Sequence, residues 1–122
     1  MENIKKHIES YGFTTKEISD IKVNGYYCKN DDSKSEFILD FSKDNFTNID
    51  DVSTRYTQLY KDAIKVVYLI QVDNNADEIM DFVEQKEFRD HTYLIYDKDD
   101  ELEFFLKDLW NVLFSLQLMK QG

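Results

Sequence analysis

The residues best suited to nucleophilic or metal chemistry are the single cysteine, Cys28, and the two histidines, His7 and His91. A thiolate paired with an imidazole can act as a nucleophile, and closely spaced His and Cys can hold zinc. Neither histidine is followed by a second His or Cys at metal-ligand spacing. Cys28 follows two tyrosines in a segment of strand character, where a free cysteine is typically a small core residue. These residues therefore favour a structural role over catalysis.

Carboxylates near a lysine could serve a metal-dependent nuclease, and an acidic loop could bind calcium. Asp73 follows a predicted strand, but Glu84 and Lys86 fall at i and i+2 of a predicted helix and so do not share a face. The run from Asp97 to Glu101 lacks the ligand ladder and central glycine of an EF-hand loop. The three glycines are too scattered for a phosphate-binding loop. The sequence thus predicts no enzyme activity, no catalytic residue, no metal and no cofactor.

The elements that would position any site begin with a helix over residues 3–11, which Gly12 would end. Residues 16–28 are predicted to be extended, with a tight turn or a bulge at Asn24-Gly25. Phe37, Leu39 and Phe41 alternate with mostly polar residues, which predicts a half-buried strand in an antiparallel hairpin with the preceding one. An amphipathic helix is predicted over residues 51–64, capped by Asp50 or Asp51.

The second half has the pattern of a βαβ unit. Residues 66–72 form a nearly continuous apolar run, typical of a central strand covered on both faces. Asn75 and Glu78 resemble a capping box that opens an acidic helix. A further apolar strand follows at residues 92–96, and this spacing favours a parallel pair. The sequence therefore predicts one domain, residues 1–122, of the α+β class, with a mixed sheet and helices packed on it.

The last predicted helix runs from residue 102 to about Met119 and is apolar around most of its circumference. A surface helix needs an apolar stripe of only about 100°. The helix is therefore either the central core helix or a helix that packs on the sheet and also meets a second protein chain. The second alternative predicts protein-binding residues on and just before this helix. They are Phe105, Trp110, Phe114, Asp97, Asp99, Asp100 and Glu101.

Charge is distributed unevenly along the chain, which carries a net charge of −10. Residues 1–61 have a net charge of −2 and residues 62–122 a net charge of −8. Such a field repels phosphate backbones and anionic membranes, so it disfavours direct nucleic-acid and membrane binding. It is compatible with a basic protein partner, and also with acidity that only maintains solubility.

Compartment and membrane topology follow from the same composition. A lone cysteine suits a reducing compartment. The segment after Met1 lacks the apolar region of a secretory signal, and no apolar run approaches the roughly 20 residues that span a bilayer. A cytoplasmic location is expected.

A family resemblance rests on the order of elements across residues 36–98. The extended hairpin and helix are followed by Val67-Tyr68-Leu69-Ile70, an acidic helix, Phe88-Arg89 and Tyr93-Leu94-Ile95. This order resembles the middle component of bacterial ABC three-component defence systems. The resemblance implies a non-enzymatic subunit that bridges an ABC-type ATPase and an effector.

Two functions are therefore expected as alternatives. The first is a protein-binding accessory or adaptor subunit in a bacterial defence system against phages or mobile elements, acting in a hetero-complex or homo-oligomer through the C-terminal helix. The second is an acidic inhibitor or immunity protein that blocks a basic groove of a nucleic-acid enzyme. Residues 73–108 hold 13 acids and 4 bases, a surface that could occupy such a groove.

Overall fold

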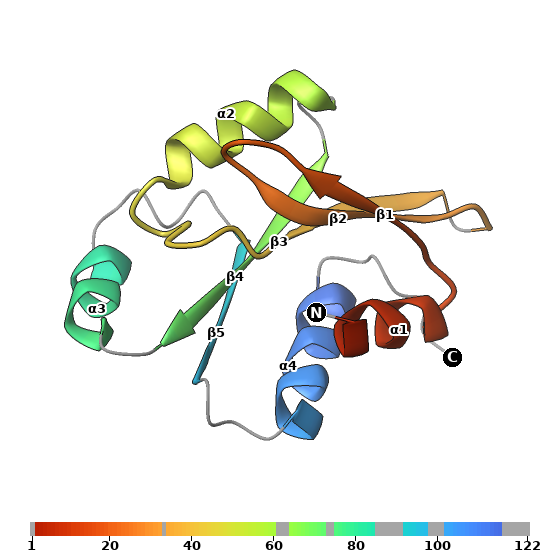
Figure 1. Ribbon diagram of the computed structural model, residues 1–122. Coiled ribbons are helices and arrows are strands. Elements are labelled where there is room, and N and C mark those ends of the chain that lie inside the picture. Colours follow the sequence, from red (N-terminus) through yellow and green to blue (C-terminus); the bar gives the residue numbers. More distant parts are fainter. Residues whose placement is uncertain are drawn as a thin grey trace.

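Four helices and five strands make up the computed structural model, which describes residues 2–32, 34–60, 64–72, 75–84, 92–97 and 102–115 (Figure 1). The first half contains helix α1, a run of three strands and helix α2. The second half alternates strands and helices. In chain order the elements are α1 (Glu2–Ser10), β1 (Thr14–Ser19), β2 (Asn24–Asn30), β3 (Ser35–Asp40), α2 (Ile49–Leu59), β4 (Lys65–Val72), α3 (Ala76–Glu84), β5 (Thr92–Asp97) and α4 (Leu102–Ser115).

The sheet is mixed and its strands lie in sequence order, β1-β2-β3-β4-β5. β1, β2 and β3 pair antiparallel, whereas β3, β4 and β5 pair parallel. This confirms the α+β class, the predicted hairpin across the loop after Asn30 and the parallel pair flanking α3. The parallel pairing of β3 with β4, which makes α2 a second crossover helix, was not predicted.

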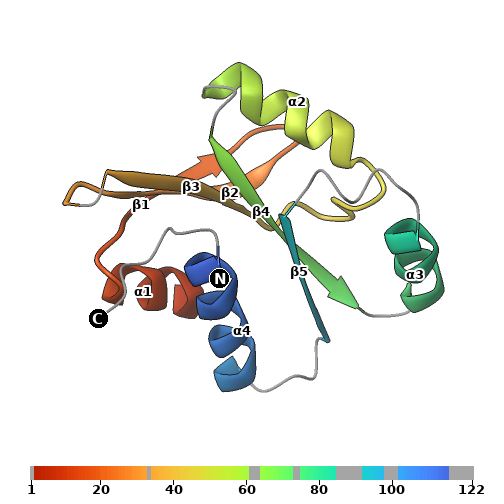
Figure 2. The same ribbon diagram turned by 180° about the vertical axis from the view of Figure 1, so that it is seen from behind.

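The helices cover both faces of the sheet, α1 and α4 on one side and α2 and α3 on the other (Figures 1 and 2). Side-chain alternation divides the strands between two cores. Phe37 and Leu39 of β3 point toward α1 and α4, and Ile38 points toward α2 and α3. Residues 67–70 of β4 are all 3% exposed or less, which confirms β4 as a central strand.

The strand prediction for β3 was wrong in one respect, because β3 is buried on both faces. Phe37, Ile38, Leu39 and Asp40 each have 0% exposure. The alternation of apolar and mostly polar residues indicated a solvent-facing side, but α2 covers that side. Ile38 among the polar positions was the signal for this second buried face.

The predicted turn or bulge at Asn24-Gly25 was also wrong. The chain turns earlier, where the Asp20 N–H donates to the Val23 carbonyl at 2.9 Å, and this turn divides the extended segment into β1 and β2. Gly25 lies within β2 and serves close packing instead. A Cβ there would lie 2.6 Å from the Leu39 carbonyl oxygen and 2.7 Å from the Tyr56 hydroxyl.

The helix ends agree with the sequence in part. Gly12 has a φ of +96° just after α1, as expected of a glycine that ends a helix. α2 begins at Ile49 rather than residue 51, after the N-cap residue Asn48, so the predicted Asp50 or Asp51 cap was wrong. The long apolar C-terminal helix is not supported. α4 has 14 residues, and the predicted extension to Met119 lies outside the described residues.

Candidate protein-binding surfaces

Of the residues singled out for nucleophilic or zinc chemistry, the structure describes Cys28 and His7. Cys28 is completely buried, and burial raises the pKa of its thiol to about 12. Because the thiolate is the nucleophile, this cysteine is unreactive in the fold. His7 lies on α1 with its ring edge against Tyr11, at a centroid distance of 4.8 Å. His91 lies outside the described residues.

The acidic candidates do not form a metal centre in the part of the chain that is described. No three His, Cys, Asp or Glu side chains there come close enough to hold an ion. Glu84 is exposed on α3, while Asp73 and Lys86 fall outside the description. Asp97 ends β5, and Asp99, Asp100 and Glu101 are outside the described residues.

A buried polar network, which the sequence did not indicate, centres on Asp40. This residue ends β3 with 0% exposure and accepts hydrogen bonds from the Ser42 and Tyr56 hydroxyls. The Asn45 side-chain amide also donates to it, at 2.7 Å, as does the Ser42 N–H, at 3.3 Å. Burial raises the pKa of Asp40, and the bonds from Ser42, Tyr56 and Asn45 act in the opposite direction.

Each of the three side-chain donors to Asp40 also reaches a second acceptor. The Tyr56 and Ser42 hydroxyls lie 3.2 and 3.3 Å from the Asn24 carbonyl, and the Asn45 amide lies 2.9 Å from the Leu69 carbonyl. The network therefore joins β2, β3, α2 and β4. Because Asp40 is closed to solvent, the network holds the β3–α2 connection in place and offers no site for a ligand.

α4 carries the first candidate surface. Leu109 and Leu113 are fully buried against the sheet, and α4 contacts β5. Trp110 follows Leu109 and Phe114 follows Leu113. The two rings stack with a centroid distance of 5.1 Å and an interplanar angle of 13°. Trp110 is 36% exposed and Phe114 is half-buried, so two of the three predicted aromatic residues meet at the surface. The side chain of Phe105 is outside the description.

The second candidate surface lies on α3. Ile79 is buried, and the Phe82 ring packs against that of Phe46 with a centroid distance of 6.1 Å, so one side of α3 faces the loop that precedes α2. The other side is acidic around Met80, which is 58% exposed. Its exposed carboxylates are Asp77, Glu78, Asp81 and Glu84.

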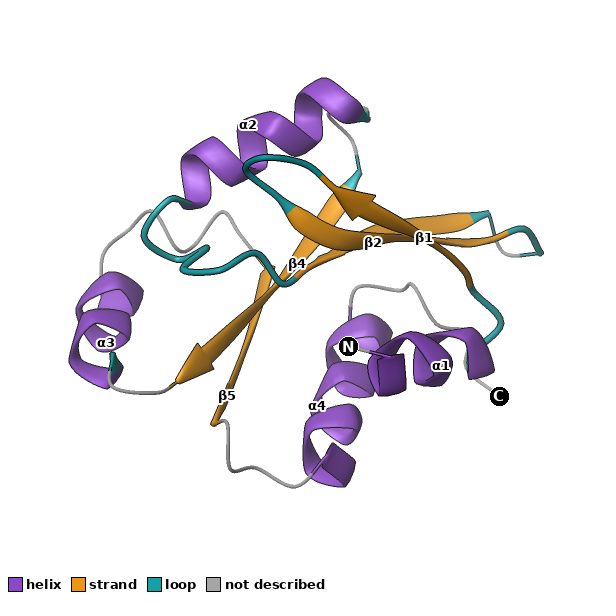
Figure 3. Cartoon of the chain, in the orientation of Figure 1, coloured by secondary structure: helices purple, strands orange, loops and turns teal. Residues whose placement is uncertain are grey.

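A third surface, which was not predicted from the sequence, lies between edge strand β1 and the end of α2. Lys16 and Ile18 of β1, with Leu59 and Tyr60 at the end of α2, line a hollow of about 340 Å³. Asp20 closes it at the β1–β2 turn, and its carboxylate forms an ion pair with Arg55 of α2. Figure 3 shows this turn beside α2.

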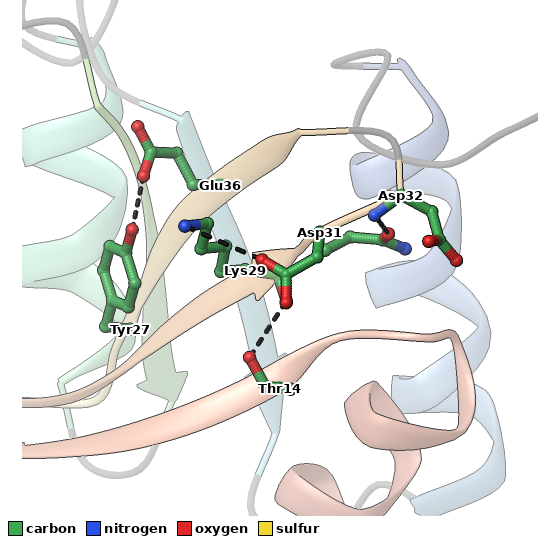
Figure 4. A network of polar contacts seen from close by, with 7 residues as sticks. Thr14, Tyr27, Lys29, Asp31, Asp32 and Glu36 are labelled. Carbon is green, nitrogen blue, oxygen red and sulfur yellow. Dashed lines mark hydrogen bonds and ion pairs between the residues drawn. The ribbon is translucent and has the colours of Figure 1, made fainter.

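One wall of this hollow is held by a tyrosine pair. Tyr60 stacks on Tyr27 with a centroid distance of 4.9 Å and an interplanar angle of 4°. The Tyr27 hydroxyl donates to the Glu36 carboxylate, and this bond raises the pKa of Tyr27 to about 12 (Figure 4). The hydrogen bond fixes one ring, and the stack thereby orients the other.

Polar contacts also connect residues at the start of β1 and at the end of β2. The Thr14 hydroxyl donates to the Lys29 carbonyl at 3.2 Å, and the Lys29 ammonium pairs with Asp31 at 3.6 Å. Figure 4 shows Thr14 beside the β2–β3 turn. The Thr14–Lys29 bond joins β1 to β2 where β1 begins.

Comparisons of the chain with protein-family models, with curated proteins and with solved structures found no match. The resemblance to the middle component of ABC three-component systems therefore stays an expectation from element order. Among the described residues, no helix is long and apolar enough to cross a membrane.

Proposed function

We propose that this protein is a non-enzymatic accessory subunit that binds another protein through α4. The observation that carries the proposal is the stacked pair of Trp110 and Phe114 at the surface, next to the buried Leu109 and Leu113. Trp is the residue most enriched among those that dominate interface energies. A helix that uses one face for the core and holds an ordered aromatic pair on the next is suited to a second contact.

The resemblance across residues 36–98 guides where the partner is sought. It implies a subunit that bridges an ABC-type ATPase and an effector, and we place the protein in a bacterial anti-phage or anti-mobile-element defence system on that basis. The buried Cys28 thiol supports a binding role, since it removes the one cysteine nucleophile of the chain.

The test compares the wild-type chain with Trp110→Ala and Met80→Ala in affinity capture from the native host, read by mass spectrometry. Met80 is the matched control because it is more exposed than Trp110 but lies on α3. We expect one partner to be retained by wild type and Met80→Ala and lost with Trp110→Ala. Equal retention by both variants, with both still folded, would reject α4 as the contact surface.

The acidic face of α3 favours a second candidate, an inhibitor that occupies a basic groove of a nucleic-acid enzyme. Four exposed carboxylates on one helix would steer such a partner electrostatically. Replacing Asp77, Glu78, Asp81 and Glu84 by their amides would then slow association, and added salt would slow the wild type in the same way. Binding through Trp110 should change little with salt, so a salt series separates the two functions.

A further inference from the structure

β1 is an edge strand with one free side. Among the described residues it pairs only with β2. In an antiparallel pair, alternate residues direct both their N–H and C=O away from the partner, so β1 presents a row of unpaired backbone groups. The hollow lined by Lys16, Ile18, Leu59 and Tyr60 runs beside this edge.

Exposed apolar side chains lie along the same line. Leu59 is 41% exposed at the end of α2, and Ile21, next to Asp20 in the turn, is completely exposed. An edge strand beside a helix, with apolar side chains between them, is the arrangement by which a peptide joins a sheet as an added strand. Backbone bonds would come from β1 and side-chain selection from the hollow.

We propose that the groove between β1 and α2 binds an extended segment of another protein, which pairs with β1 as a further strand. Alternate side chains of that segment would face the hollow and meet Ile18, Leu59 and Tyr60. The segment should therefore be apolar at every second position on that side. This surface is separate from α4, so the inference does not depend on the function proposed above.

A second copy of this chain fits the edge poorly. Two β1 strands related by a two-fold axis must oppose residues that lie on the same face of the sheet. With the axis in the middle of the strand, Lys16 opposes Lys16 or Glu17 opposes Glu17, and like charges in that position repel. Moving the axis further along leaves only a short overlap, because β1 has 6 residues.

Charge completes the description of the partner. The net charge of −10 attracts a basic segment and repels an acidic one. The groove itself is nearly neutral, because Asp20 is paired with Arg55. We therefore expect apolar residues within the groove and Lys or Arg on either side of it.

Proline substitutions at two adjacent residues test the backbone pairing. N–H directions alternate along a strand, so of Lys16→Pro and Glu17→Pro one removes a bond to β2 and the other removes an outward N–H. Proline is tolerated on the outer side of an edge strand. Urea unfolding identifies the second variant as the one with stability near that of the wild type.

The probes are peptides selected against the full chain from a phage-displayed library of random sequences. We expect the selected peptides to alternate apolar residues and carry Lys or Arg. The stable proline variant should bind them at least roughly tenfold more weakly, because strand addition depends on main-chain hydrogen bonds. Leu59→Lys should weaken binding too, while Thr54→Lys, which adds the same charge at an exposed position of α2, should not.

Three results would overturn the proposal. One is a selection that enriches no peptide, or only peptides with helical spacing. Another is a set of peptides that bind the stable proline variant and Leu59→Lys as well as the wild type. The third is a wild-type dimer in light scattering that the proline variant abolishes, which would make the occupant a second copy.

Discussion

Removal of the Asp40 carboxylate tests the packing of the whole crossover region. In Asp40→Ala, four hydrogen bonds to the carboxylate are lost, from the Tyr56 and Ser42 hydroxyls, the Ser42 N–H and the Asn45 amide. The two hydroxyls can turn to the Asn24 carbonyl, which lies within 3.3 Å of both. At about 1 kcal/mol for each lost bond, the free energy of unfolding should fall by about 4 kcal/mol.

Urea unfolding followed by tryptophan fluorescence measures this change, with Asp81→Ala as the control. Asp81 is an exposed acid on α3, and its replacement should change stability by less than about 0.5 kcal/mol. Tyr56→Phe removes one of the four bonds, and its free energy of unfolding should lie between those of the two variants. Equal midpoints for Asp40→Ala and Asp81→Ala would refute the structural role of the network.

The pH dependence of the same network has a definite sign. Burial raises the pKa of Asp40 above its ordinary value of 3.8, so the folded protein retains a proton that the unfolded chain has released. This contribution to stability is present at low pH and is lost as the pH rises through the folded pKa. Asp40→Asn has no such proton. The amount by which the free energy of unfolding of Asp40→Asn falls below that of the wild type should therefore shrink as the pH rises from about 4 toward 7. A difference that grows over this range would contradict the reasoning.

Three further predictions concern neighbouring residues. Gly25→Ala should lower the free energy of unfolding by about 2–4 kcal/mol in urea titrations, because the added Cβ overlaps the Leu39 carbonyl and the Tyr56 hydroxyl. Cys28 should resist thiol reagents in native buffer and react fully in urea, so rapid native labelling would contradict its burial. In an alkaline absorbance titration, Tyr27→Phe should remove one tyrosine that ionises at about pH 12, and Glu36→Gln should shift that ionisation to lower pH.

Element types were largely predictable because each carries a local pattern. The structure contains the helix predicted from the periodicity of α1, the strand predicted from the apolar run of β4 and the parallel pair predicted from the spacing of β4, α3 and β5. Boundaries were less predictable where apolar residues continue past an element. Apolar residues continue after Leu59 as far as Ile64, so periodicity alone extended α2 to residue 64, whereas the helix ends at Leu59.

Of the candidate surfaces and buried groups, those that depend on a local pattern could be predicted and those that depend on distant segments could not. The apolar circumference of α4 led to Trp110 and Phe114 as candidate binding residues, and because they are four residues apart they meet on one side of the helix. Asp40 and the groove beside β1 could not be predicted, because both depend on pairings between distant segments. Asp40 gains its buried position only when α2 crosses over β3, and β1 becomes an edge only through the strand order.

The position of the two proposed contact surfaces bears on what a bridging subunit requires. α4 contacts β5 at one edge of the sheet, and the groove borders β1 at the other. Strands lie about 4.8 Å apart, so four intervals separate these edges by roughly 19 Å. Two partners could therefore bind at once, and the affinity of a selected peptide for the β1 groove should not change when the α4 partner is bound. The proposed groove would also give the first half of the chain a binding role of its own, beyond that of a scaffold for the acidic second half.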